Sequence, residues 1–372
     1  MLNRRKWLLS LTVIGAGVAG LVVAKIPAGG VPEGGDSRDV SALAADSPAR
    51  LTRASNEPAD SAGRVVRDDV PYEDVVWPWE DNPGWLERRA TLLRDPVLKL
   101  SGRGTASDRI SALAPGSGRY RMMSDSQLRE VLPFFPEIRT LWLKVDDLSD
   151  AGLESTRALP YLETLVLRGS EDAEGERPQI TAKGMAALSH HQRLRHLGLH
   201  HLRIDDEEFA QLGELQSIQM LYFSGSDLTP RCFQTIAQWP AIRHIGVGYQ
   251  DWNEPIDRTT HRAVASLDGR LSILAFGGDR YSVKGNSRIH PSLIRAVSDV
   301  HSLTQLILGD IDHLSPEDLE PIRKLNNLFT LDAAWPQSAE VRERLLELER
   351  EMRARRRHES SSAGNQPSGE RP

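Results

Sequence analysis

A short apolar pattern returns eight times between residues 138 and 334, and this repetition restricts the fold more than any other feature of the chain. Each copy carries apolar residues at its first, fourth and sixth positions, all of them large except Ala333 in the last copy. The copies begin at Ile138, Leu162, Leu194, Ile218, Ile242, Leu271, Leu303 and Leu328. The intervals between them are 24, 32, 24, 24, 29, 32 and 25 residues. A unit of this size cannot bury its own apolar face, so the sequence predicts a stack of units around one continuous core.

Each copy predicts a short strand followed by a helix. The fourth and sixth positions alternate with more polar ones, which is the period of a strand with one buried side. Behind the strands come helix-start signals, such as Ser315 followed by Pro316, Thr229 followed by Pro230, and Asp205 with Glu208. Apolar pairs three residues apart follow these signals. The sequence therefore predicts an α/β solenoid, with a curved parallel sheet and with helices on its convex side.

The copies resemble the leucine-rich repeat family, whose pattern is L-x-x-L-x-L-x-x-N/C-x-L. The stretches "LSDAGL", "ITAKGM", "IDDEEF", "LTPRCF" and "LSPEDL" resemble the subclass written I-T-D-x-G-L. That subclass occurs in bacterial repeat proteins and in some ubiquitin-ligase adaptors, but no F-box precedes the repeats here. The family's Asn/Cys position is replaced by Asp146, Ser170, Leu202, Ser226, Gln250, Asp279 and Ile311. This departure predicts a less regular, more open coil.

Composition divides the chain into six segments. We expect a signal peptide or transmembrane anchor at 1–26, a disordered linker at 27–69 and an N-terminal cap region at 70–127. The leucine-rich repeat domain should cover 128–336, a C-terminal capping helix 337–358, and a disordered tail 359–372. The linker contains no aromatic residue, so it buries too little apolar area to offset the entropy of ordering.

The first segment reads as an export signal. Arg4, Arg5 and Lys6 precede a stretch without charge, Trp7 to Ala24, and "NRRKWLLS" resembles a twin-arginine signal. Positive charge on the N-terminal side predicts that the rest of the chain is exported. If the segment is not cleaved, its 18 uncharged residues span about 27 Å as a helix, enough to cross a bilayer. We expect a protein that is either membrane-anchored with its C-terminal part exported, or periplasmic or extracellular.

The same segment contains a glycine pattern, Gly15-x-Gly17-x-x-Gly20, that occurs in dinucleotide-binding turns. Such a turn must be followed by a helix and a second strand. Pro27 and Pro32 end any helix soon after Gly20, and no second strand follows. We therefore expect no cofactor, although an exported cofactor-dependent enzyme stays an alternative because twin-arginine export often carries folded holoproteins.

Four aromatic residues gather just before the repeats. Tyr72, Trp77, Trp79 and Trp85 lie within 14 residues. They predict a cap over the first repeat or, alternatively, an aromatic patch for a partner or a glycan.

The third, fifth and seventh positions of each repeat should face solvent on the concave side of the sheet. In the first half of the repeats these positions are basic and aromatic, and in the second half they are mostly glycine and alanine. The residues that we predict to bind a partner are Trp142, Lys144, Arg168, His196, His200, Tyr222 and His244. We expect an unidentified protein or other macromolecule as the partner, with no catalysis. A structural envelope protein without a specific ligand is a further alternative.

Other kinds of site find little support. The net charge of −6 and the pI near 6.0 argue against a nucleic-acid partner. The single cysteine, Cys232, excludes an internal disulfide and a zinc-thiolate cluster. His196 and His200 should be about 13 Å apart along a strand, and His196 and His244 about 9.6 Å apart across strands. These distances are too long for one metal ion, so we expect no metal site.

Overall fold

The computed structural model describes residues 82–94, 100–102, 110–113, 123–170, 180–277, 287–333 and 338–363. The chain divides into two compact units, Met1–Ala54 and Ser55–Pro372, and every described residue belongs to the second unit. The predicted signal or anchor segment and the predicted linker lie outside the described residues.

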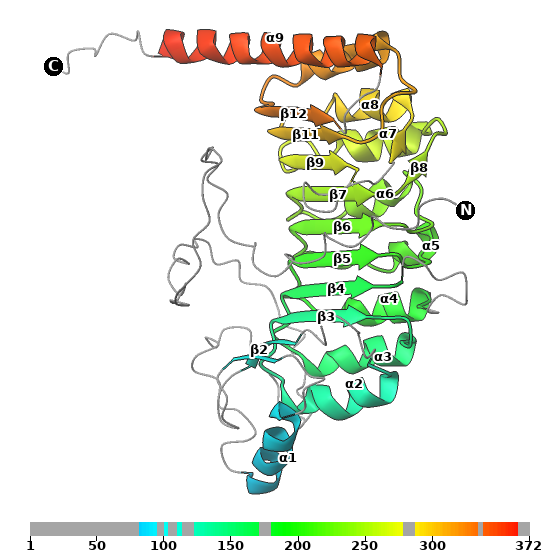
Figure 1. Ribbon diagram of the computed structural model, residues 1–372, viewed down its shortest axis with the longest axis vertical. Coiled ribbons are helices and arrows are strands. Elements are labelled where there is room, and N and C mark those ends of the chain that lie inside the picture. Colours follow the sequence, from blue (N-terminus) through cyan, green and yellow to red (C-terminus); the bar gives the residue numbers. More distant parts are fainter. Residues whose placement is uncertain are drawn as a thin grey trace, which may run out of the picture. The chain divides into compact units, whose positions relative to one another are not determined.

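The predicted repeat strands form one sheet (Figure 1). Its order is β1-β2-β3-β4-β5-β6-β7-β9-β11-β12, with β1 antiparallel to β2 and every other pair parallel. The strands are β1 (Leu100–Gly102), β2 (Ile110–Leu113), β3 (Thr140–Lys144), β4 (Thr164–Arg168), β5 (His196–His200), β6 (Met220–Ser224), β7 (His244–Gly248), β9 (Ile273–Phe276), β11 (Gln305–Leu308) and β12 (Thr330–Ala333). A second, two-stranded parallel sheet pairs β8 (Asp251–Trp252) with β10 (Arg288–Ile289).

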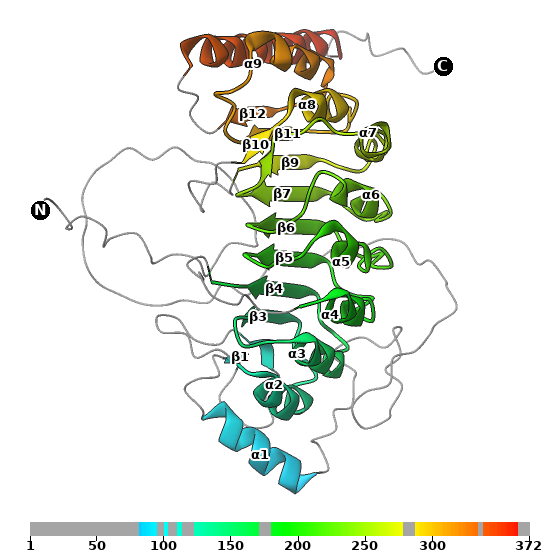
Figure 2. The same cartoon turned by 90° about the vertical axis from the view of Figure 1, so that its right-hand side faces the viewer.

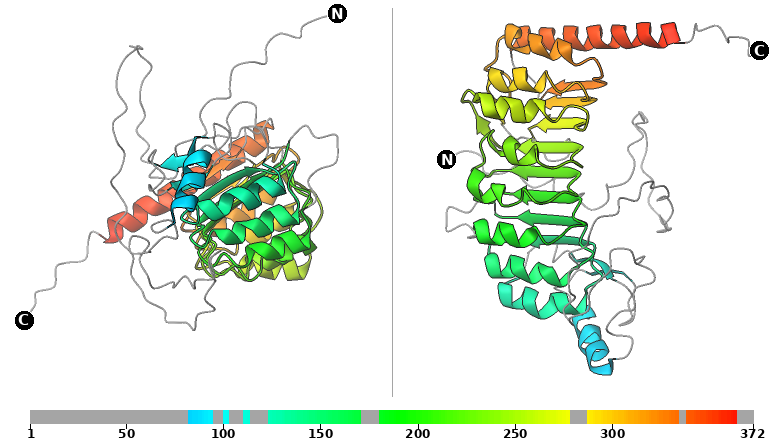
Figure 3. Two further views of the ribbon diagram at one scale, coloured as in Figure 1. Left: turned by 90° about the horizontal axis from the view of Figure 1, so that it is seen from below. Right: turned by 180° about the vertical axis from the view of Figure 1, so that it is seen from behind.

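The helices between the strands lie along one side of the large sheet (Figures 2 and 3). They are α2 (Asp125–Val131), α3 (Asp150–Glu154), α4 (Ala182–Leu188), α5 (Asp206–Ala210), α6 (Cys232–Ile236), α7 (Arg258–Ala265) and α8 (Pro291–Val297), with 3₁₀ helices η2 (Leu132–Phe134), η3 (Ser155–Ala158) and η4 (Pro316–Lys324). Repeated strand–helix units stacked on a parallel sheet make the α/β solenoid that the sequence predicts.

The core runs as ladders of aliphatic side chains between the sheet and these helices. The strands pair in register, so that Leu141 lies beside Leu165, which lies beside Leu197. The complete ladder of fourth-position residues is Leu141, Leu165, Leu197, Leu221, Ile245, Leu274, Leu306 and Leu331, all of them buried. Burying one such side chain stabilises the fold by about 1.5–3 kcal/mol.

A carboxylate at the start of one helix binds the N-cap residue of the next helix. Asp150 Oδ1 accepts a hydrogen bond from the backbone N–H of Thr181 at 2.8 Å, and Asp150 Oδ2 accepts one from the Thr181 hydroxyl at 2.6 Å. Asp125 binds Ser149 in the same way. Asp206 binds Thr229, which lies two residues before Arg231, the N-cap residue of α6. These bonds connect neighbouring repeats on the helical side.

The Asn/Cys position also connects repeats at two points. Asp146 accepts hydrogen bonds from the backbone N–H of Ser170 at 2.7 Å and from its hydroxyl at 2.5 Å. Gln250 bonds through its side-chain amide to Ser226, the same position of the preceding repeat. Other polar groups therefore replace the family's asparagine here.

Both ends of the described stack are covered by helices. At the N-terminal end, Arg89 of α1 (Pro83–Leu93) forms a fully buried ion pair with Glu137, and Trp85 packs on Phe134 with ring centroids 5.4 Å apart. The aromatic residues before Trp85 lie outside the described residues, so the choice between a cap and an aromatic patch stays open.

At the C-terminal end, α9 (Ala339–Ala363) packs on η4 and β12. Its apolar residues Val341, Leu345, Leu348 and Met352, spaced four, three and four residues apart, form one stripe and are all buried. The helix continues to Ala363, beyond the predicted end at residue 358. Among the helices that the structure describes, none combines the length and apolar character needed to cross a membrane.

Candidate functional site

The side of the sheet that faces away from the helices carries the predicted partner-binding residues. We call the third, fifth and seventh positions of the repeats the open sheet face. The predicted residues Trp142, Lys144, Arg168, His196, His200, Tyr222 and His244 all lie on it, on strands β3 to β7. None of these seven side chains is buried, whereas the fourth and sixth positions beside them are.

The register places the open-face residues in three rows across the strands. Trp142 lies beside Val166, and then come Gly198, Tyr222 and Gly246. The Trp142 side chain is 38% exposed, which is unusual for a large apolar group in this structure. Because Val166, Gly198 and Gly246 on this row are smaller, the side chains of Trp142 and Tyr222 extend further from the sheet than their neighbours.

Tyr222 and His244 form one contact unit on neighbouring strands. Their rings meet edge to face with centroids 4.9 Å apart, and the Tyr222 hydroxyl lies 3.2 Å from His244 Nδ1. A Cβ atom at Gly246 would lie 2.5 Å from Tyr222 Cδ1. The tyrosine ring therefore leans over Gly246, and any larger residue at this position would displace it.

The seventh-position row is polar, and acidic groups reduce its positive charge. Lys144 Nζ lies 3.0 Å from a carboxylate oxygen of Asp146, which also binds Ser170. Partial burial opposes ionisation of Asp146, but bonds from Ser170 and Lys144 outweigh it and lower its pKa. Next to Lys144 on this row is Arg168, which is exposed. His200 Nδ1 lies 2.9 Å from the Ser224 hydroxyl.

Two histidines of this face, His196 and His244, are held in their neutral form. Burial, with a contribution from His196, lowers the pKa of His244 to about 4. Burial and Arg195 lower the pKa of His196, whose Nδ1 lies 3.2 Å from the Thr164 hydroxyl. At neutral pH these rings therefore offer uncharged hydrogen-bonding groups and not cations.

From β7 onward the fifth and seventh positions of the open sheet face are mostly small. Gly246, Gly248, Ala275, Gly277 and Gly309 are buried, whereas Ile307 is half-buried and Asp332 is exposed. A Cβ atom at Gly309 would lie 2.5 Å from the backbone oxygen of Ser287, so this position already packs against the chain itself. The aromatic and basic side chains of the face are therefore concentrated on β3 to β7.

Sequence reasoning did not find the groups that surround the predicted residues. Asp146, Thr164 and Ser224 each bind a predicted side chain from a neighbouring position or strand. Tyr249, just after β7, is 40% exposed, and its backbone is left-handed at φ 52°. Aligning the repeats in register could have predicted the contacts of Asp146, Thr164 and Ser224. Nothing in the sequence indicated that Tyr249 is exposed.

The structure does not gather the histidines around one point. His196, His200 and His244 each lie within hydrogen-bond distance of a different hydroxyl group. Within the described ranges, no group of three or more His, Cys, Asp or Glu side chains is arranged to hold a metal ion. Cys232 is buried in α6, and burial raises its pKa well above the ordinary value. A buried thiol of this kind is not a nucleophile.

Comparison with known proteins gives structural similarities only. No protein-family model and no curated protein matches the chain. An internalin of Listeria monocytogenes is 16% identical over 59% of this chain and 67% of its own length, with a TM-score of 0.31. A chain of the yeast Rad7–Elc1 complex is 16% identical over 56% and 66%, with a TM-score of 0.27. A chain of the TLR13–ssRNA13 complex is 14% identical over 56% and 38%, with a TM-score of 0.32.

Proposed function

We propose that the chain is a non-enzymatic binding scaffold that recognises a protein partner through its open sheet face. The observation that carries this proposal is a pair of large aromatic side chains, the exposed Trp142 and the half-buried Tyr222, on a face that the described helices leave uncovered. The strands of Val166 and Gly198 separate them. Tryptophan, tyrosine and arginine are the residues that contribute most to binding at protein interfaces.

The arrangement favours an extended partner. Trp142 and Tyr222 supply aromatic anchors, and Arg168 supplies a charge between them. A net charge of −6 supports a protein partner and not a nucleic acid.

The proposal is tested by affinity capture with three versions of the full chain. Wild type, Trp142→Ala/Tyr222→Ala and the control Phe329→Ala/Leu346→Ala are immobilised and exposed to extract of the source cells. The control removes two exposed apolar residues that lie off the open sheet face. We expect quantitative mass spectrometry to show one protein retained by wild type and control and depleted at least about tenfold by the open-face variant. Equal recovery on all three would contradict recognition by this face.

We also propose that the scaffold is exported or tethered to a membrane. The support is the sequence of residues 1–26, where Arg4, Arg5 and Lys6 precede an uncharged segment. Cell fractionation of wild type and Arg4→Gln/Arg5→Gln checks it. We expect the variant to stay inside the cell, and retention of wild type there would contradict the proposal.

A further inference from the structure

The second positions of the repeats form a row across the N-terminal ends of the strands, beside the open sheet face. From β3 to β7 the members of this second-position row are Arg139, Glu163, Arg195, Gln219 and Arg243. Each of the last four donates its backbone N–H to the carbonyl oxygen of the member before it, at 2.8 Å in every case. Neighbouring members are therefore one strand apart, or about 4.8 Å.

Two arginines of this row, Arg195 and Arg243, have no acidic partner among the described residues. Both side chains are exposed. The Arg195 side chain makes no hydrogen bond or ion pair within the described part of the chain. The Arg243 guanidinium donates to the backbone oxygens of Pro240 at 3.4 Å and of Ile242 at 2.9 Å. The two arginines are two strands apart, so their backbones are separated by about 9.6 Å.

The acidic residues of the same region are already paired with basic ones. Glu163 accepts a hydrogen bond from Arg139 Nε at 3.0 Å, and a carboxylate oxygen of Asp146 lies 3.0 Å from Lys144 Nζ. None of the third, fifth and seventh positions from β3 to β7 is acidic. The region therefore has an excess of positive charge, although the net charge of the chain is −6.

This positive charge changes the pKa values of neighbouring groups. Burial and then Arg195 lower the pKa of His196, although Glu163 acts in the opposite direction. Burial and then Arg243 lower the pKa of Arg270. A helix dipole favours a cation only within its last turn, whereas Arg195 and Arg243 each lie seven residues after the end of α4 or α6. Stabilisation of a helix therefore does not explain why arginine occupies these positions.

The opposite ends of the strands lead into acidic helix starts. Burial raises the pKa of Glu208 on α5, and the nearby carboxylates of Asp205, Asp150 and Asp227 add to the rise, against a bond from the Asp205 backbone. The two ends of the strands thus carry opposite charge. An acidic partner is attracted to the end with the arginines and repelled from the other end.

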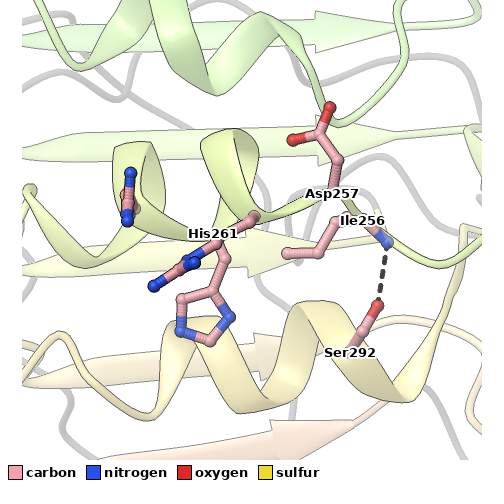
Figure 4. Close-up of a pocket in the computed structure, with 6 residues that line it drawn as sticks. Ile256, Asp257, His261 and Ser292 are labelled. Carbon is pink, nitrogen blue, oxygen red and sulfur yellow. Dashed lines mark hydrogen bonds between the residues drawn. The ribbon is translucent and has the colours of Figure 1, made fainter.

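On the helical side, by contrast, acidic residues accompany the basic ones. A hollow of about 390 Å³ between α7 and α8 is lined by Asp257 as well as by Arg258 and Arg262 (Figure 4). His261 Nε2, also at this hollow, lies 3.1 Å from Asp299 Oδ2. The excess of positive charge at the second-position row is therefore not a general property of the surface.

We propose that the partner of the open sheet face binds through an acidic protein segment that lies along the second-position row and pairs with Arg195 and Arg243. The inference rests on the proposed function and adds the chemistry of the partner. Guanidinium and carboxylate groups form charge-assisted hydrogen bonds, which are stronger than those between neutral groups. His196 and His244 directly follow the two arginines, so their rings offer hydrogen-bonding groups to the same segment.

A random dodecapeptide library displayed on phage tests the proposal, with the full chain immobilised. We expect the peptides selected on wild type to contain more Asp and Glu than the unselected library. The preference should disappear on Arg195→Gln/Arg243→Gln and remain on the charge-conserving Arg195→Lys/Arg243→Lys. The matched control, Arg262→Gln/Arg295→Gln, removes two exposed arginines of α7 and α8 and should keep the preference.

Isothermal titration calorimetry with one selected peptide, made by synthesis, measures the size of the effect. Arg195→Gln/Arg243→Gln should weaken binding at least about tenfold, because each arginine loses charge-assisted hydrogen bonds. Arg262→Gln/Arg295→Gln should leave the affinity unchanged within about twofold. Added salt should weaken binding to wild type more than binding to Arg195→Gln/Arg243→Gln, since salt screens exposed charges.

Two results would overturn the acidic segment. One is a preference for Asp and Glu that persists on Arg195→Gln/Arg243→Gln or disappears equally on Arg262→Gln/Arg295→Gln. The other is displacement of the selected peptide by an oligothymidylate of the same length as effectively as by the free peptide, because the row would then attract any polyanion.

Trp142→Ala/Tyr222→Ala separates this inference from the proposed function. If this variant loses the selected peptide while Arg195→Gln/Arg243→Gln keeps it, the open sheet face binds the partner without an acidic segment. If it keeps the peptide while the arginine variant loses it, the row binds acidic peptides and the proposed use of the open sheet face is wrong. Recovery on wild type no higher than on a surface without protein would contradict both.

Discussion

At the scale of single residues, the third and fifth positions of the I-T-D-x-G-L-like motif depend on each other across repeats. A Cβ atom at Gly152 would lie 2.4 Å from Asp125 Oδ1, and one at Gly184 would lie 2.3 Å from Asp150 Oδ1. The glycine therefore makes room for the carboxylate of the preceding repeat. One repeat has Ala182 at the third position in place of the aspartate. The fifth position of the following repeat is then the larger Glu208, whose side chain caps its own helix.

Replacing one of these glycines should break a link between repeats. We expect Gly152→Ala to lower the free energy of unfolding by about 1–3 kcal/mol, because the new methyl group displaces the Asp125 carboxylate from Ser149. Urea unfolding measures the change. Gly84→Ala is the control, since a Cβ there meets its nearest atom at 3.7 Å; an equal loss in both variants would show that the loss is independent of the carboxylate.

The buried histidine His191 should make the fold sensitive to acid. Its Nε2 lies 2.9 Å from the Thr156 hydroxyl, and burial, with smaller effects of His190 and Arg157, lowers its pKa from 6.5 to about 4. Between these values the unfolded chain binds a proton that the folded chain does not, so stability falls as the pH falls from 6.5 toward 4. The slope for this group is at most about 1.4 kcal/mol per pH unit.

Urea unfolding between pH 4.5 and 7 checks this dependence. His191→Gln should flatten the slope, although it lowers stability at pH 7 by removing a buried contact. The exposed His301 provides the control, and His301→Gln should keep the wild-type slope. A wild-type slope in His191→Gln would show that other groups cause the acid sensitivity.

The sequence predicted the positions of the residues discussed above and not their bonds between repeats. Asp205 and Ser315 were identified as helix starts from local spacing, and the structure gives each a capping box. Asp146 was counted as a departure from the family pattern, yet it binds Ser170. Its partner lies 24 residues away, and only the stacked register brings the two together.

At the scale of elements, α9 illustrates how an amphipathic pattern determines where a helix packs. Leu348 is buried against the last repeat, whereas Leu346 on the same helix is 47% exposed. We expect Leu348→Ala to lower the free energy of unfolding by about 2–5 kcal/mol, since it leaves a cavity in a packed interface. Leu346→Ala should change it by less than about 0.5 kcal/mol. Thermal unfolding compares them, and similar losses would show that α9 does not seal the stack through this stripe.

The sequence predicted the strands closely because they alternate strictly and pair in register. The helices were predicted less well. Several span only a few residues, since a short repeat leaves little length between strands, and the helix predicted after Ser315 is the 3₁₀ helix η4. Pro321 inside it cannot donate the backbone hydrogen bond of an α-helix.

At the scale of the whole molecule, a stack of repeats should unfold locally, with a few adjacent repeats opening together. Trp252 packs on Phe223, Phe233 and Phe276 with ring centroids 6.0, 6.0 and 6.2 Å away, and so joins elements of successive repeats. Because repeats contact mainly their neighbours, we expect Trp252→Ala to weaken the centre of the array by about 3–5 kcal/mol more than its ends.

Hydrogen exchange resolves this effect along the chain. Protection should fall most in β6, β7 and β9 and least in α9. Trp142→Ala serves as the control, because that side chain is partly exposed and should leave protection unchanged. A uniform fall over all strands would instead mean that the array unfolds as one block.

The candidate site could be predicted only in part at this scale. Counting positions within the repeats placed Trp142, Tyr222 and the others on one face, and the structure places them there. The contact of Tyr222 with His244 over Gly246, and the neutral state of that histidine, depend on burial between strands.

The two ends of the large sheet determine how copies of this chain can associate. An open edge strand is a template on which a further strand can add, and stacked repeats present such an edge at each end. Here the sheet ends in the short antiparallel strand β1 on one side, while α9 packs on β12 at the other (Figure 1). Growth into end-to-end filaments is thereby disfavoured, and self-association, where it occurs, must use the faces of the sheet and helices.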